Sequence, residues 1–140
     1  MTPPIELLGM YLHLARAAEL RRQPLVCDRV LLLAGVIAVQ IDLAPIAAAC
    51  RERILAHNPG HMLHRWPTMG AALGEEDFQS LMSQLTKRYG PEQVEHLVTQ
   101  LGIERGNERA TYASGGEYAA GLLGMNWDDL VRRFGAEGSG

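Results

Sequence analysis

Three of the five histidines of this 140-residue chain lie within eight residues of one another, in the stretch CRERILAHNPGHMLHRWPTM. His57, His61 and His64 are separated by four and three residues, a spacing at which helical side chains share one face. Imidazoles spaced in this way can bind zinc, and Cys50, two helical turns before His57, offers a thiolate ligand. A metal site is therefore the first chemical hypothesis that this stretch raises.

The backbone signals in the same stretch argue against a shared face. If Asn58 is an N-cap and Pro59 the first helical residue, His61 and His64 share a short new helix while His57 ends the preceding one. The histidines have no nearby carboxylate to act as a general base, and there is no HExxH motif. We therefore predict no metal ligands and no cofactor, and expect packing and capping histidines. A bound metal or anion stays an open alternative.

The same segment is a candidate surface for contact with another protein. Its residues His57, His61, His64, Arg65 and Trp66 combine aromatic and basic side chains. Trp and Arg are the residue types most enriched at binding hot spots. In the alternative, the Trp66 ring covers the hydrophobic core and no partner is involved.

Composition restricts the classes of protein that this chain can represent. The net charge of -3 conceals an asymmetry, since residues 1–70 carry seven arginines against five acidic residues and residues 71–140 carry six bases against eleven acids. An anionic partner is thus expected at the first half. Two cysteines without a spacing motif indicate buried thiols in a reducing compartment. The first residues lack the features of a secretory signal, which favours the cytoplasm.

Hydrophobic periodicity and helix signals predict an all-α fold, a compact single domain of residues 1–140 with about six or seven helices. Val26 to Gln40 is apolar on nearly every side but too short to span a membrane, so it should be a central core helix. A dimer interface is the alternative. Local signals also predict helix caps at Thr2 and Asp42 and a polar loop over 104–111. A helix over 74–90 has acids at its start and bases at its end, as the helix dipole favours, and a helix over 91–102 should end in a left-handed turn at Gly102.

The last part of the chain, residues 114–135, is expected to fold as two short helices joined at Gly124, where a tight turn needs a positive φ. Ser114 with Glu117 has capping-box spacing. Within this part, the segment AAGLLGMNWDDLVRRF from Ala119 to Phe134 resembles the helix-turn-helix unit of the Fis type. The resemblance covers about sixteen residues and implies a DNA-associated regulator.

The second helix of this unit departs from the pattern of a DNA reader. Its first turn, which would meet phosphates and base edges, carries Trp127 followed by Asp128 and Asp129. The nucleic-acid candidates reduce to Trp127, Arg132 and Arg133, and the local charge opposes binding to phosphate. We therefore expect nucleic acid not to be the partner and keep DNA regulation as the alternative function.

Catalytic patterns are absent from the sequence. Ser114 lies in neither a G-x-S-x-G elbow nor a phosphate loop, and the capping box accounts for it. Glu75, Glu76 and Asp77 are adjacent, so they point to different sides of a helix and cannot pair as acid and base. We predict a non-enzymatic helical domain that acts through contacts with a protein partner or with itself, as a homodimer, and not with a membrane.

Overall fold

The computed structural model describes residues 2–103 and 114–138, and every regular element in these ranges is helical. The elements in chain order are α1 (Pro4–Leu20), α2 (Pro24–Gln40), α3 (Ala44–His57), the 3-10 helix η1 (Met62–Arg65), α4 (Met69–Ala72), α5 (Glu76–Arg88), α6 (Pro91–Gln100), α7 (Gly115–Leu122) and α8 (Trp127–Gly138). The predicted all-α class is confirmed. The predicted number of helices was too low because α4 is a single turn, too short to show a period. The polar loop expected over 104–111 lies outside the described residues.

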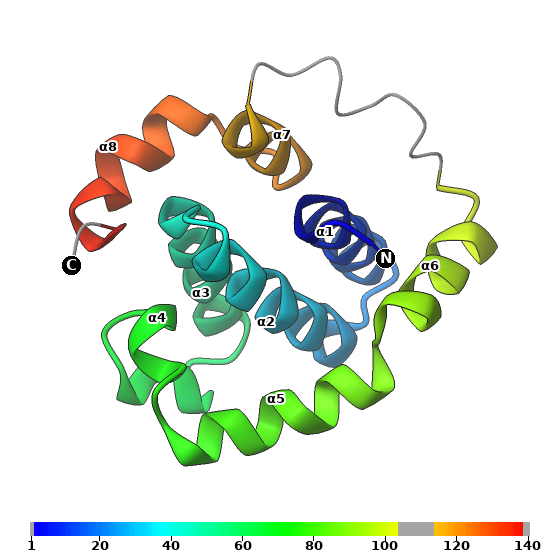
Figure 1. Cartoon of the computed structure of the whole chain (residues 1–140), viewed down its shortest axis with the longest axis horizontal. Coiled ribbons are helices and arrows are strands. Elements are labelled where there is room, and N and C mark those ends of the chain that lie inside the picture. Colours follow the sequence, from blue (N-terminus) through cyan, green and yellow to red (C-terminus); the bar gives the residue numbers. More distant parts are fainter. Residues whose placement is uncertain (1, 104–113, 139–140) are drawn as a thin grey trace.

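Helix α2 lies at the centre, with α1 and α3 packed along it and α4 and α5 against further sides (Figure 1). Ten of its seventeen residues are buried, which is more than one face of a helix can supply. The predicted central core helix is therefore confirmed, although it begins at Pro24, because proline suits the first helical position. In the described part of the chain, no helix combines the length and the apolar character needed to cross a bilayer.

Two predicted helix starts are wrong. Asp42 does not cap α3: its φ of 60° places it at the end of α2, where the Leu43 amide donates to the Ala38 carbonyl at 2.7 Å. The N-cap of α3 is Leu43, and the N-cap of α1 is Pro3 rather than Thr2. Each of these helices has a proline in its first turn. Because proline has no N–H group, one amide fewer needs a side-chain cap there. Only residues 41–43 connect α2 to α3, so the two helices return side by side in opposite directions.

Four helices of the described chain end with a residue of positive φ. Gly102 and Gly124 both have a φ of 72°, as predicted from the steric freedom of glycine. Arg22 and Asp42 occupy the same position at the ends of α1 and α2, with φ values of 56° and 60°. Side chains other than glycine rarely adopt this conformation, so the sequence gives no signal for these two turns.

Helices α5 and α6 form an outer layer along one side of the bundle (Figure 1). Helix α5 begins with Glu76 and Asp77 and ends with Lys87 and Arg88, the predicted order that complements the helix dipole. The Tyr11 hydroxyl of α1 donates to the backbone oxygen of Tyr89, at the end of α5, at 2.5 Å. Burial raises the pKa of Tyr11 to about 12, so this donor keeps its proton at neutral pH.

Helices α7 and α8 form the predicted C-terminal hairpin and pack against α1 and α3 (Figure 1). The Ser114 hydroxyl accepts from the Glu117 amide at 3.1 Å, which confirms the predicted cap of α7. The Asn126 side chain accepts from the Asp129 amide at 3.1 Å and caps α8 in the same way. Leu130 of α8 is almost fully buried.

The close approach of α7 and α8 gives a prediction about stability. A Cβ at Gly116 would lie 2.6 Å from ring atoms of Trp127. We expect Gly116→Ala to displace this ring and to lower the free energy of unfolding by about 1–3 kcal/mol. The control is Gly135→Ala in α8, where a Cβ would make an ordinary contact of 3.7 Å with Val131 and should be neutral or stabilising. Equal losses for both variants in urea unfolding would contradict the prediction.

Candidate functional site

The three histidines of the predicted cluster have different surroundings. His57 is the last residue of α3, His61 precedes η1 and His64 lies within η1. The Nδ1 atom of His61 accepts from the Leu63 amide at 3.1 Å, so this ring caps η1. His64 is exposed. In the described chain, the groups of three or more potential metal ligands that converge include His57 but neither of the other two histidines.

Trp66 and Arg65 hold η1 to its neighbours. The half-buried Trp66 ring meets Phe78 of α5 edge to face, with 6.0 Å between ring centroids. The Arg51 guanidinium donates to the Trp66 carbonyl at 2.8 Å. Arg65 lies over the Trp66 ring at 5.2 Å and pairs with Asp77 at 3.3 Å. These contacts engage much of the predicted partner surface within the molecule.

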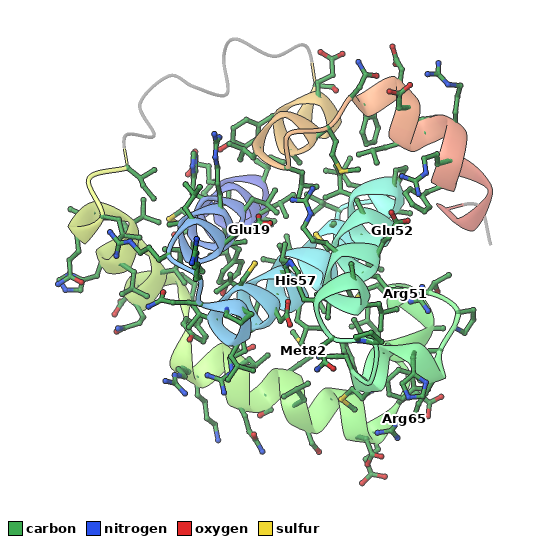
Figure 2. The ribbon with its side chains drawn as sticks, turned by 180° about the vertical axis from the view of Figure 1, so that it is seen from behind. Glu19, Arg51, Glu52, His57, Arg65 and Met82 are labelled. Atoms are coloured by element: carbon green, nitrogen blue, oxygen red, sulfur yellow. The ribbon has the colours of Figure 1, made fainter. Side chains whose placement is uncertain are left out.

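His57 is held between two carboxylates from other helices. Its Nδ1 atom lies 2.8 Å from Asp28 Oδ1 of α2, and its Nε2 atom lies 4.0 Å from Glu19 Oε1 of α1. Because an ionised carboxylate can only accept, Nδ1 carries the proton in the contact with Asp28. Figure 2 shows Glu19 and His57 near the middle of one face of the molecule, away from Arg65 at its edge.

Asp28 is the buried charged residue of the described chain, with 6% of its surface exposed. The His57 side chain remains 26% exposed and can reach solvent. A carboxylate removed from water needs a hydrogen-bonding partner, because burial of an unpaired charge costs far more than burial of a paired one. The position of Asp28 therefore requires a donor such as His57 on the adjacent helix.

Cys27 precedes Asp28 and joins the same cluster. The ligand atoms of Cys27, Asp28 and His57 all lie within 4.8 Å of one another. Burial, with a contribution from Glu19 and Asp28, raises the pKa of Cys27 to about 12, while Arg53 opposes the shift. Cys50 is also a buried thiol with a pKa raised to about 12 by burial, but it lies outside this cluster.

Sequence reasoning missed Cys27, Asp28 and Glu19, because it sought partners for the histidines only among nearby residues. A usable signal was present. Asp28 is a charged residue in an otherwise apolar helix. In an antiparallel pair of helices joined by a short connection, here residues 41–43, residues at equal distances from the connection lie side by side. Asp28 lies 13 residues before this connection and His57 lies 14 residues after it, so the two are close to such a pair.

A cavity of about 340 Å³ lies beside this cluster, between α1, α2, α3 and the end of α7. Its polar lining comes from Arg16, Glu19, Cys27 and Arg53. Arg53 also donates to the Leu123 carbonyl at 3.0 Å, which ties α3 to the C-terminal hairpin. Thus the Cys27 thiol, although almost fully buried, faces a space that a small solute can enter.

A second hollow lies on the other side of α1, where α1, α2 and α6 meet. It has a volume of about 230 Å³ and is mainly apolar. Its lining includes Leu14, Ala18, Arg21, Val30 and Leu97. The turn between α1 and α2, at residues 21–23, lies beside this groove and is flanked by the exposed side chains of Leu20 and Leu25. We call the groove and this turn with its two leucines the α1–α2 corner.

The nucleic-acid candidates lie on α8 or at its start. Trp127 is half-buried and packs over Gly116. Arg133 donates to both oxygens of Glu52 on α3, at 2.8 and 3.0 Å, and Arg132 pairs with Asp129. Both arginines that would contact a phosphate group are thus already paired with carboxylates of this chain.

Comparison with protein families, with curated proteins and with solved structures gave no match.

His61 predicts a dependence of stability on pH. Burial lowers the pKa of His61 below 6.5, and the neutral ring accepts the Leu63 amide. Because the unfolded chain binds this proton more readily, the free energy of unfolding should fall as pH drops through 6.5 and should level off below the lowered pKa. Urea titrations between about pH 5 and 8 measure this contribution. It should vanish in His61→Asn, which can still cap η1, and persist in His64→Asn. An unchanged pH profile in His61→Asn would contradict this role.

The Asp28–His57 contact predicts that truncation of His57 lowers the free energy of unfolding more than the partial exposure of this residue suggests. His57→Ala leaves the buried carboxylate without its donor, so we expect a loss of about 1–3 kcal/mol in the free energy of unfolding. His64→Ala in the same segment should change it by less than about 0.5 kcal/mol. Combining His57→Ala with Asp28→Asn should recover part of the loss, since the amide carries no charge. Strictly additive losses would show that the contact contributes nothing.

Proposed function

We propose that this chain is a protein-interaction domain whose α1–α2 corner binds an acidic amphipathic helix of a partner protein. The observation that carries the proposal is the exposure of two large apolar side chains on either side of a turn whose residues Arg21 and Gln23 line an apolar groove, although Leu20 itself lines the cavity on the other side of α1. Leu20 is 77% exposed and Leu25 is 66% exposed, and both flank the turn between α1 and α2. Exposed apolar surface with a rim of polar side chains is typical of sites that bind other proteins.

The charge around the corner supports an acidic partner. Residues 16–25 contain three arginines and one glutamate, and Arg16, Arg21 and Arg22 are all exposed. Arg21 also lines the apolar groove, so a helix lying there would place its flanking carboxylates near guanidinium groups. A helix in a groove is bound by side chains at every third or fourth position, with the charged rim setting orientation.

We choose this surface over residues 57–66 because key side chains of that segment already make contacts within the molecule. Trp66 packs on Phe78, Arg65 pairs with Asp77, and His57 pairs with Asp28. Leu20 and Leu25, in contrast, remain largely in solvent. We place the interaction in the cytoplasm, a proposal that the two free thiols support.

A labelled peptide tests the proposal by fluorescence anisotropy. The probe is a synthetic amphipathic helix with leucines along one face and glutamates on its flanks. Burial of two leucines is worth a few kcal/mol, so Leu20→Ser with Leu25→Ser should weaken binding by at least about tenfold. The double variant Arg21→Glu with Arg22→Glu should bind the acidic peptide more weakly and should bind a version with lysines on its flanks more tightly.

The matched control is Val131→Ser on α8, the remaining large apolar side chain that is exposed in the described chain, at 41%. It should leave binding unchanged. Equal binding of acidic and basic peptides, or normal binding by the double serine variant, would refute the proposal. Sedimentation at several concentrations tests the competing occupant, because self-association that the same serine substitutions abolish would make a second copy the partner.

A further inference from the structure

Three side chains of different metal-binding types converge where α1, α2 and α3 meet. They are the Cys27 thiol, the Asp28 carboxylate and the His57 imidazole, whose ligand atoms lie within 4.8 Å of one another. A tetrahedral zinc ion, with bonds of 2.0–2.3 Å, holds its ligand atoms about 3.3–3.8 Å apart. Small side-chain rotations would bring these atoms to that spacing, and the Asp28–His57 contact of 2.8 Å would open slightly.

The chemistry of the set selects the metal. Thiolate, imidazole and carboxylate are the three ligand types that zinc accepts together, whereas calcium and magnesium require oxygen ligands. One thiolate and one carboxylate also balance the double positive charge of the ion, which matters because Cys27 and Asp28 are almost fully buried. The thiol proton would leave to solvent as sulfur became the ligand.

Glu19 completes the arrangement from a third helix. If His57 binds the ion through Nδ1, its Nε2–H faces Glu19 Oε1, now 4.0 Å away. A carboxylate that accepts from the outer nitrogen of a ligating histidine fixes the ring and raises its basicity. The cavity of about 340 Å³, lined by both Glu19 and Cys27, provides a route for the ion.

We propose that Cys27, Asp28 and His57 form a binding site for Zn²⁺, with Glu19 positioning His57. Three protein ligands leave one of the four positions of zinc for water or a solute from the cavity. The proposal does not depend on partner binding at the α1–α2 corner, because Cys27, Asp28 and His57 do not line its groove, although Leu20 lines the cavity beside them. It also replaces the three-histidine hypothesis, since His61 and His64 do not converge with His57.

Titration of the full-length, reduced protein with Co²⁺, a spectroscopic substitute for zinc, tests the site. We expect a thiolate-to-cobalt charge-transfer band that saturates at one equivalent and disappears on addition of Zn²⁺. Cys27→Ser should remove this band, while Cys50→Ser, which changes the other buried thiol, should retain it. His57→Asn should weaken binding at least tenfold, and His64→Asn should not. Glu19→Gln should weaken it by about 10–100-fold without removing the band.

Circular dichroism of each variant separates loss of the site from loss of the fold. If Cys27→Ser fails to fold, His57→Asn carries the test, because the asparagine amide can still donate a hydrogen bond to Asp28. Absence of the charge-transfer band in the native protein at saturating Co²⁺ would overturn the proposal. So would a band that survives in Cys27→Ser, or one lost equally in Cys50→Ser.

Discussion

The apolar surface of α2 must be removed from water on nearly every side, and most of the architecture follows from this requirement. The consecutive residues Leu31, Leu32 and Leu33 are almost fully buried, and neighbours in sequence point to different sides of a helix. One neighbouring helix cannot cover such a surface, so α1 and α3 pack along it while α4 and α5 close other sides. The remaining helices form an outer layer around this central group.

The position of α2 also explains where reactive groups gather. Asp28 lies in the first two turns of the most buried helix, where its charge needs a donor. The short connection to α3 brings His57 opposite it, and α1 adds Glu19 to the same place. A thiol, two carboxylates and an imidazole thus meet as a consequence of burying one charge. The α1–α2 corner differs, since Leu20 and Leu25 lie where no helix of the described chain covers them.

Features that depend on local chemistry could be predicted from the sequence. The apolar period identified α2, glycine identified the turns at Gly102 and Gly124, and Ser114 identified the start of α7. Each of these follows from the steric or hydrogen-bonding properties of a single residue type.

Features that depend on tertiary packing could not be predicted in this way. Arg22 and Asp42 adopt positive φ because helix packing fixes the turns, against the preference of their side chains. The cluster around His57 joins residues from three helices, and its register depends on the turn at Asp42, which local signals place at the start of α3 and the structure places at the end of α2. The end of the preceding helix at His57 is confirmed, but the next short helix begins at Met62 with His61 as its N-cap, and not at Pro59 with Asn58 as its N-cap.

Native-state hydrogen exchange tests most directly the claim that α2 is the enclosed centre. The account predicts that amides in the middle of α2, from Leu31 to Gly35, exchange only by global unfolding, with the free energy measured by urea. Amides of α5 and α6 in the outer layer should exchange through smaller openings. Exchange of the α2 amides at or below the free energy found for α6 would contradict the central position on which both proposed sites depend.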